Sequence, residues 1–235
     1  MTKKRRSKKR KQEILRNKKL VKKYPWLRPR NVWTGKMPKD YDYSYIEWGW
    51  SKGWDAAFGQ MYLEELNEAV QKSGHAKDFF IEQIKEKYGS ARNYVSFYTD
   101  AIRDVINKYE YLSQNICICC GKPDVPMINT GWMSPECFDC FRKGQKRHEN
   151  YLVKLGKKIT PLTEEEIKQE YEDYIDEEPD ENGEYKMTNA YTIRRWDSIT
   201  DKPIDETFDI TETANAIRKR WEKRREQYAK RKMAR

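Results

Sequence analysis

The sequence has no long apolar run. No segment approaches the roughly 20 consecutive apolar residues that a membrane-spanning helix requires, and the basic start is not followed by the apolar stretch of a signal peptide. Charged residues make up 37% of the chain, as large a share as the apolar residues. We therefore expect a protein of the reducing cytosol, where cysteines stay as thiols or bind metals.

Histidine is scarce, and glycine-rich motifs are missing. The 235 residues include two histidines, His75 and His148, which leaves no convincing Ser/His/Asp or Cys/His set for nucleophilic catalysis. No glycine-rich segment has the spacing that cradles a phosphate group. A nuclease built beside a metal site would need a histidine there, and only His148 could serve. We therefore expect a protein that is not an enzyme.

Cysteine is also rare, but four of the five cysteines form two pairs. Two residues separate Cys117 from Cys120, two separate Cys137 from Cys140, and sixteen lie between the pairs. This spacing is typical of a tetrahedral zinc site with four thiolate ligands. Four thiolates leave no open position for water, so the expected Zn²⁺ ion is structural rather than catalytic.

The residues around the cysteine pairs favour a zinc ribbon. Gly121 follows the first pair, where a tight turn often needs a positive φ, and Pro135 restrains the chain before the second. Residues 125–132 are apolar enough for a short hairpin that turns at 129–131. The sequence therefore predicts two thiolate turns joined by a hairpin around one metal ion.

The same cysteines are open to other chemistry. Disulfides would form only in an exported chain, and a redox pair would need a βαβ context, which is absent. Cys119 lies inside the first turn and could replace Cys117 or Cys120 as a ligand. Gly121, directly after Cys120, favours Cys117 and Cys120, the outer pair of the three, as the ligands. His148 is a conceivable substitute ligand that a four-cysteine site does not need.

Positive charge is concentrated at the two ends of the chain. Residues 1–23 have a net charge of +12, residues 218–235 a net charge of +8, and residues 24–217 a net charge of −10. The first segment should be disordered when free, because like charges repel and it has little apolar surface. Ile14, Leu15 and Leu20 could let its second half become helical on binding.

Both basic ends can neutralise phosphates and release counterions. The alternatives are a solvated tail at the N-terminus and a core-docked helix with a solvated basic face at the C-terminus. The predicted nucleic-acid-binding residues are Lys3, Lys4, Arg5, Arg6, Lys8, Lys9, Arg10, Lys11, Arg218, Lys219, Arg220, Lys223, Arg224 and Arg225.

Residues 24–54 are rich in Trp and Tyr and keep neither a helical nor a strand period. One interpretation is a long ordered loop whose rings fill the core. The other is an exposed surface for stacking or partner binding, since aromatic rings beside arginines suit bases and protein anchors. The candidate partner-binding residues are Trp26, Arg28, Arg30, Trp33, Trp48 and Trp50.

Hydrophobic periodicity predicts an α+β fold. Before the cysteines we expect helices over 55–74, 78–88 and 100–114 and a short strand over 91–98. The helix over 78–88 is placed between a capping Asp78 and a terminating Gly89. The helix over 100–114 leads directly into Cys117, so the ribbon should dock on this small helical domain.

The chain after the cysteines predicts a smaller helix–hairpin–helix region. Thr163 and Glu166 form a capping box that opens a helix, residues 185–196 and 203–210 alternate as a hairpin, and a basic amphipathic helix follows Asp209. Such a helix could bind nucleic acid, an anionic membrane or an acidic protein. The expected domains are a basic arm (1–23), an aromatic-rich helical domain with the zinc ribbon (24–147, ribbon 117–140) and a C-terminal region (148–235).

An acidic segment precedes the predicted hairpin. Residues 164–184 contain twelve Asp/Glu and one Lys. They form either a solvated face and loop, or an anionic surface that mimics nucleic acid or covers the protein's own basic ends. Residues 142–147 are likewise either a basic flank of the ribbon or the solvated start of a linker helix.

Several distinctive motifs occur between residues 24 and 142. They are Tyr24-Pro-Trp-Leu, Pro29-Arg-Asn-Val-Trp33, Asp40-Tyr-Asp-Tyr-Ser-Tyr45, Gln83-Ile-Lys-Glu-Lys-Tyr-Gly89, Cys117-x2-Cys120-Gly-Lys-Pro and Thr130-Gly-Trp-Met-Ser-Pro-x-Cys137-x2-Cys140. Together they resemble those of a family of small proteins encoded by phages and prophages of Gram-positive bacteria. The resemblance covers roughly residues 24–142 and brings no established activity. It implies a zinc-binding role for Cys117, Cys120, Cys137 and Cys140, and a protein that works in the host bacterial cytoplasm.

Two functions fit these observations. The first is a phage accessory protein that binds nucleic acid (RNA or DNA) or a host nucleoprotein through its basic termini, around a structural zinc ribbon. The second is a protein-binding inhibitor of a host defence system, an anti-CRISPR-like counter-defence factor. It would use the acidic segment 164–184 and the aromatic segment 24–54.

Overall fold

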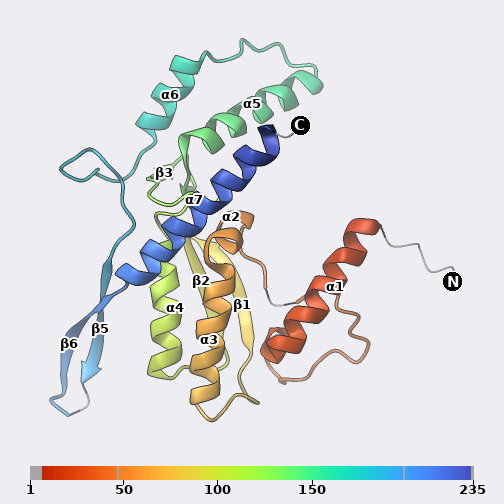
Figure 1. Ribbon diagram of the computed structural model, residues 1–235, viewed down its shortest axis with the longest axis vertical. Helices are drawn as coiled ribbons and strands as arrows, with labels where there is room; N and C mark the ends of the chain where they lie inside the picture. The colour runs from red at the N-terminus through yellow and green to blue at the C-terminus, as the bar shows by residue number, and fades with distance from the viewer. Residues whose placement is uncertain (1–6, 47, 198, 234–235) are drawn as a thin grey trace. The chain divides into compact units, whose positions relative to one another are not determined.

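The computed structural model describes residues 7–46, 48–197 and 199–233, which adopt an α+β fold of helices and two-stranded antiparallel sheets (Figure 1). They form two compact units. Unit 1 comprises the described residues of Met1–Trp50, Gln60–Lys87 and Ala91–Asn107. Unit 2 comprises those of Ser51–Gly59, Tyr88–Ser90 and Lys108–Arg235. Among these residues, no helix combines the length and the apolar character needed to cross a bilayer.

Unit 1 begins with helix α1 (Lys8–Lys23), where disorder is predicted for the free basic segment. Ser7 caps the helix by accepting a hydrogen bond from the Arg10 amide. Ile14, Asn17 and Val21 lie on one face and are buried. The prediction of disorder is wrong for α1, because three residues at helical spacing give this basic helix a packed face.

The aromatic segment forms the core of unit 1. Trp48 and Trp50 are both 8% exposed, and the Trp50 ring lies 4.6 Å from the ring of Tyr62 in helix α3 (Gln60–Lys72). Trp26, in the short 3₁₀ turn η1 (Pro25–Leu27), contacts Phe79 edge to face. The first interpretation of residues 24–54, a loop whose rings fill the core, therefore holds for these three tryptophans.

A β-hairpin occupies the segment where a helix is predicted over 78–88. Strand β1 (Ile81–Lys87) pairs with strand β2 (Ser90–Val95). Tyr88 and Gly89 between them both have positive φ, 50° and 75°, as a two-residue type I′ turn requires. The helix prediction is wrong because Gly89 serves this turn instead of ending a helix.

Unit 2 is built around a second aromatic core. Helix α2 (Lys52–Trp54) continues into the π-helical turn η2 (Asp55–Gly59). Trp54 and Phe58 are fully buried, and Phe58 lies 5.3 Å from Tyr109, ring to ring. Tyr109 belongs to helix α4 (Asp100–Ser113), which the sequence predicts within one residue.

The chain around the cysteines forms a hairpin and two helices within unit 2. Strands β3 (Met127–Asn129) and β4 (Met133–Pro135) pair antiparallel, so the second strand lies beyond the hairpin predicted over residues 125–132. They are followed by helix α5 (Phe138–Lys154) and helix α6 (Glu164–Asp173), whose predicted capping box is present. An apolar cluster of Ile128, Phe141, Ile167 and Tyr171 joins β3, α5 and α6.

Strands β5 (Ala190–Asp197) and β6 (Lys202–Asp209) pair antiparallel in the region where alternation predicts a hairpin, and they lead directly into helix α7 (Thr211–Met233; Figure 1). Ala214 and Ile217, in the first two turns of α7, are buried. The ribbon and the C-terminal segment thus belong to one unit. This division differs from the boundary expected at residue 147, because α5 and α6 share an apolar cluster with the ribbon.

The buried core of unit 2 can be tested at Trp54. Its indole Nε1 donates a 2.8 Å hydrogen bond to the Ile116 carbonyl oxygen. Trp54→Phe keeps a ring but leaves that carbonyl without its donor in the interior, which should lower the free energy of unfolding by about 1–3 kcal/mol in urea denaturation. Trp33→Phe, at a side chain that is 91% exposed, should change it by less than about 0.5 kcal/mol. Equal effects of the two substitutions would contradict this role.

Candidate metal centre

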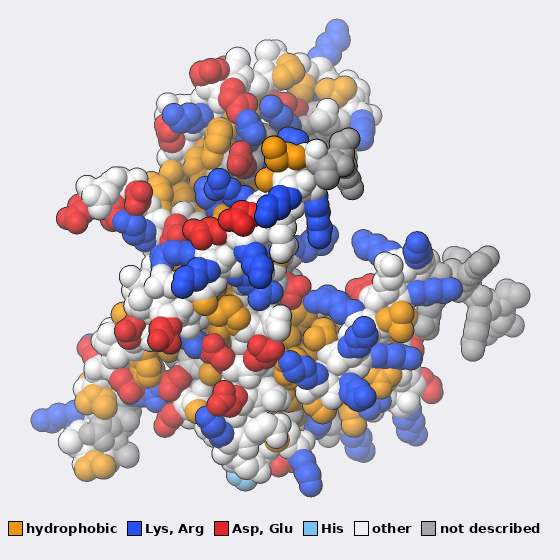
Figure 2. Space-filling view, in the orientation of Figure 1, with side chains coloured by type: hydrophobic (Ala, Val, Ile, Leu, Met, Phe, Trp, Pro, Cys, Tyr) orange, Lys and Arg blue, Asp and Glu red, His pale blue; other side chains and the backbone are white. Residues whose placement is uncertain are grey.

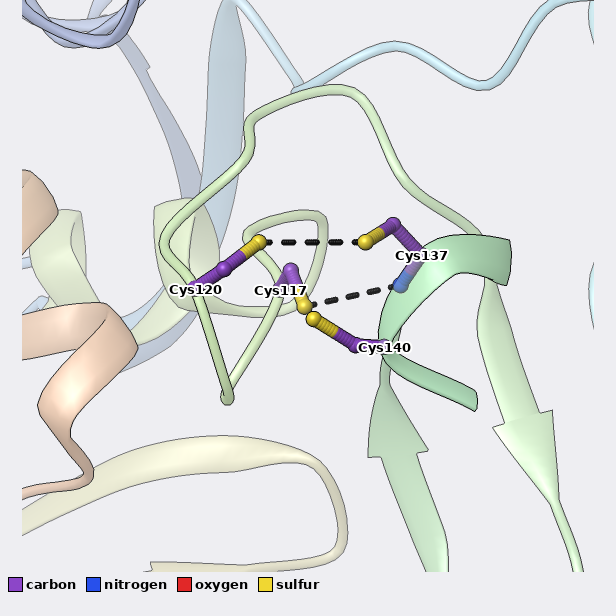
Figure 3. A group of neighbouring side chains, drawn as sticks. All are labelled: Cys117, Cys120, Cys137 and Cys140. Atoms are coloured by element: carbon purple, nitrogen blue, oxygen red, sulfur yellow. Dashed lines mark hydrogen bonds between the residues drawn. The ribbon is translucent and has the colours of Figure 1, made fainter. Parts of the chain in front are cut away.

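The four paired cysteines converge in unit 2. The sulfur atoms of Cys117, Cys120, Cys137 and Cys140 all lie within 4.8 Å of one another. Figure 3 shows them facing each other between the loop after α4 and the start of α5. Cys117 and Cys137 are almost fully buried, whereas Cys120 is partly exposed.

The spacing of the sulfurs fits a tetrahedral metal ion. Metal–sulfur bonds of about 2.3 Å at tetrahedral angles place sulfur atoms about 3.8 Å apart. The Cys120 and Cys137 sulfurs are 3.7 Å apart, whereas a disulfide bond would hold them at about 2.05 Å. The four side chains can therefore hold one metal ion with little movement.

The first cysteine pair lies on a tight turn. The Gly121 amide donates to the Cys117 carbonyl oxygen at 2.8 Å, and the Cys117 amide donates to the Lys122 carbonyl oxygen at 2.8 Å. Gly121 has a φ of 80°, a left-handed conformation that glycine adopts without strain. The turn thus depends on the glycine that the sequence places directly after Cys120.

The second cysteine pair lies at the start of α5. Cys137 is the N-cap residue, and the Cys140 amide donates to the Cys137 carbonyl oxygen at 2.9 Å. The Cys137 amide also donates to the Cys117 sulfur at 3.5 Å. A helix N-terminus and an amide donor both stabilise negative charge on sulfur, which favours thiolate ligands here.

Gly53 in α2 supports the first turn from outside. Its amide donates to the Ile118 carbonyl oxygen at 3.1 Å. A Cβ atom at this position would lie 2.3 Å from the Cys117 carbonyl oxygen and 2.4 Å from that of Ile118. Only glycine therefore allows α2 to approach the cysteine turn so closely.

The thiols share their protons unequally when no cation is bound. Hydrogen bonds from the other thiols, that of Cys119 first, lower the pKa of Cys117 well below its usual value. Hydrogen bonding to the other thiols, Cys117 first, raises the pKa of Cys140. These opposite shifts come from hydrogen bonds among the thiols themselves. A divalent cation reverses this pattern by stabilising every thiolate that binds it.

Cys119 stays outside the cluster. Its side chain is exposed and its sulfur donates to the Glu136 carboxylate at 3.2 Å. Hydrogen bonding to Cys117, burial and the Glu136 charge raise the pKa of Cys119 to about 12. His148 is exposed on α5 and is not one of the clustered residues. The outer cysteine pair is thus the one the structure brings together.

The predicted nucleic-acid-binding residues fall into three groups. Lys3, Lys4, Arg5 and Arg6 lie outside the described residues. The second group is exposed, in the first turn of α1 and along α7, and consists of Lys8, Lys9, Arg10, Lys11, Lys219, Lys223 and Arg225. Figure 2 shows Lys and Arg side chains over both helices.

The third group makes contacts within unit 2, which engage Arg218 and Arg220 in hydrogen bonds but leave the Arg224 Nη1 atom without a hydrogen-bond partner among the described residues. The Arg218 guanidinium binds both carboxylate oxygens of Asp124 at 2.8–3.2 Å, so it is not available to a phosphate. The Arg220 Nε atom donates to the Ala56 carbonyl oxygen at 3.2 Å. The Arg224 guanidinium lies over the Trp221 ring, 5.7 Å from its centre.

Most of the candidate partner-binding residues are occupied inside unit 1. Trp26, Trp48 and Trp50 are buried, which leaves them out of reach of a partner. Arg28 and Arg30 are partly buried, with their guanidinium groups over the rings of Tyr41 and Phe80. Trp33 alone of the six has a highly exposed side chain.

Sequence reasoning missed Gly53 and the Arg218–Asp124 pair. Both join segments more than 60 residues apart, so no local pattern marks them. Asp124 has a positive φ of 55°. Asp tolerates that conformation better than most residues, so the residue type itself was a weak signal for a turn at this position. The chain matches no family model, and neither curated proteins nor solved structures include a detectable match.

The close approach of α2 to the cysteine turn can be tested at Gly53. In Gly53→Ala the added methyl group meets two backbone carbonyl oxygens, so the turn must move. We expect a loss of about 1–3 kcal/mol in the free energy of unfolding and a weaker affinity for metal. Gly144→Ala, in α5, is the matched control. Its Cβ has 3.9 Å of clearance, and alanine should stabilise the helix by up to about 1 kcal/mol. Similar behaviour of the two variants would contradict the steric argument.

Proposed function

We propose that the four-cysteine centre holds one structural zinc ion. Thiolate ligands in a tetrahedral arrangement suit Zn²⁺, and the sulfur spacing and burial described above support this assignment. Four protein ligands would fill the coordination sphere, so no position remains for a water or substrate molecule. The metal would stabilise the fold, and we propose that the protein is not an enzyme.

We further propose that the chain binds nucleic acid or a nucleoprotein. The main support is the exposed, strongly basic second half of α7. From Arg225 to Met233 every residue is exposed, yet the helix stays regular. Lys219, Lys223, Arg225, Lys230 and Arg231 have no ion-pair partner within the described part of the chain.

This concentration of cations disfavours the helix when it stands alone. Lys219 and Lys223 are four residues apart, and like charges at that spacing cost a few tenths of a kcal/mol each. A polyanion would offset the repulsion and release its own counterions. A surface of this kind is therefore better suited to a phosphate backbone than to an uncharged partner.

An anionic membrane is a poorer fit for α7. Membrane-surface helices need a broad apolar face opposite the charged one. After the buried Ile217, the large apolar side chains of α7 are Trp221, Tyr228 and Met233. They are too few to form such a face, so phosphate contact without insertion is the better assignment.

Helix α1 provides a second cationic surface. Its first turn carries Lys8, Lys9 and Lys11, all exposed, directly after the basic residues 3–6, which lie outside the described residues. The buried face of α1 fixes the direction in which these side chains project. We propose that it contacts phosphates as well.

Two acids of the acidic segment support the fold. The Glu177 carboxylate accepts hydrogen bonds from the Asn115 side chain and the Met127 amide, both at 2.9 Å. Asp180 closes its own loop by accepting from the amides of Asn182 and Glu184. With these acids and the tryptophans of unit 1 engaged, we favour nucleic-acid binding over the inhibitor hypothesis. The motif resemblance supports a phage protein acting in host cytoplasm.

The metal assignment predicts one zinc ion per chain by inductively coupled plasma mass spectrometry. Cys137→Ser should lose the ion, because a neutral hydroxyl replaces a thiolate ligand. Cys119→Ser should keep it, since Cys119 lies outside the cluster. Removal of the ion with a chelator should lower the unfolding temperature of the wild type. Zinc-free wild-type protein with an unchanged unfolding temperature would rule out the metal site.

The charge assignment predicts a steep dependence of nucleic-acid affinity on salt. Replacing Lys219, Lys223 and Lys230 by Gln should make the slope of log K against log salt less negative by about 0.7–0.9 for each lost phosphate contact. The matched control replaces the exposed Lys157, Lys158 and Lys202 by Gln, which changes the net charge equally. Fluorescence anisotropy with a labelled oligonucleotide measures both. Equal slopes for the two triple variants would contradict a role for α7.

A further inference from the structure

A groove lies between the first cysteine turn and helix α7 in unit 2. It has a volume of about 610 Å³, within the range of about 300–1,000 Å³ typical of ligand sites. One wall comes from α2, the cysteine turn and α5, and the other from the last four turns of α7. The lining residues are Lys52, Cys119, Cys120, Lys143, Trp221, Arg224, Arg225, Gln227, Tyr228 and Arg231.

The groove is strongly cationic. Five Lys or Arg side chains line it, and among the described residues that do so there is no Asp or Glu. A zinc ion with four thiolates would carry a formal charge of about −2, which two of these cations could balance. The remaining positive charge exceeds what the metal centre needs, and so it points to an anionic ligand.

Two aromatic rings accompany the cations. Trp221 and Tyr228 are seven residues apart, which places them on the same face of α7, about 10 Å apart along its axis. Tyr228 is 72% exposed, so it contributes little to the core. Trp221 is partly buried. Accessible rings beside arginines form stacking platforms for unpaired bases.

Arg224 connects the aromatic rings to the cysteine turn. Its guanidinium lies over the Trp221 ring, and its Nη1 atom lies 3.3 Å from the position that a Cβ of Gly121 would occupy. That Nη1 atom is buried and has no hydrogen-bond partner among the described residues. A buried donor without an acceptor is costly, and a phosphate oxygen in the groove would supply one.

We infer that this groove binds single-stranded nucleic acid, an inference that rests on the proposed function and specifies its substrate class. Bases stack on Tyr228 and Trp221, while Arg224, Arg225 and Arg231 bind the phosphates between them. A duplex cannot use the rings in this way, because its bases are already stacked and paired. Single strands should therefore bind more tightly than duplexes with the same number of phosphates.

The test measures fluorescence anisotropy of the full chain with a labelled oligothymidine and with a duplex of equal phosphate number. Wild-type protein should prefer the single strand. Tyr228→Ala should weaken single-strand binding about tenfold, leave duplex binding unchanged and keep the salt slope, because no charge is lost. Tyr228→Phe should restore binding, since the ring is retained. Tyr151→Ala, at an exposed tyrosine of α5 outside the groove, is the matched control and should bind like wild type.

The outcomes separate this inference from the proposed function. Binding can depend on salt and yet be equal for single strand and duplex, with Tyr228→Ala behaving like wild type. That result overturns the single-strand site in the groove and leaves nucleic-acid binding in place. Equal losses in Tyr228→Ala and Tyr151→Ala also overturn it. Absence of binding to either oligonucleotide overturns the proposed function itself. A loss confined to Tyr228→Ala and to the single strand supports the groove.

Discussion

Four sulfur atoms gathered within 4.8 Å need a cation to be ligands together. As thiolates they would repel one another strongly in so buried a place, and as thiols they make only weak hydrogen bonds. The surrounding backbone nevertheless fixes each one: a glycine turn holds the first pair, and a helix N-terminus holds the second. The local geometry is therefore organised for charge that these side chains cannot balance by themselves.

This centre positions much of unit 2. Helix α2 packs against the cysteine turn at Gly53. The second cysteine pair lies at the start of α5, whose apolar face packs against β3 and α6. Helix α7 meets the same turn through Arg224. The conformation of the cysteine turn thus affects both the metal ligands and the position of Arg224. We expect the groove to keep its shape only while the turn keeps its conformation.

Patterns within the sequence predicted the features whose cause is local. The cysteine spacing, the capping box at Thr163 and the periodicity of α4 each depend on residues close in the chain. The helix expected over 78–88 failed because Gly89 can end a helix or complete a hairpin turn, and only strand pairing decides between them. Disorder was wrongly expected over Lys8–Lys23 because three buried residues outweigh a high density of charge.

The Asp124–Arg218 pair has a mechanical consequence. It fixes α7 near its start, and beyond Arg225 the helix is exposed throughout its described length. Arg220 and Arg224 hold the next two turns, at the Ala56 carbonyl oxygen and at the cysteine turn. At 1.5 Å per residue, Met233 then lies about 14 Å along the axis beyond Arg224. A helix held at one end behaves as a lever, so a tilt of about 10° at Arg224 would displace the far tip of α7 by about 2 Å. The three arginines therefore keep the space beside the cysteine turn nearly constant in width.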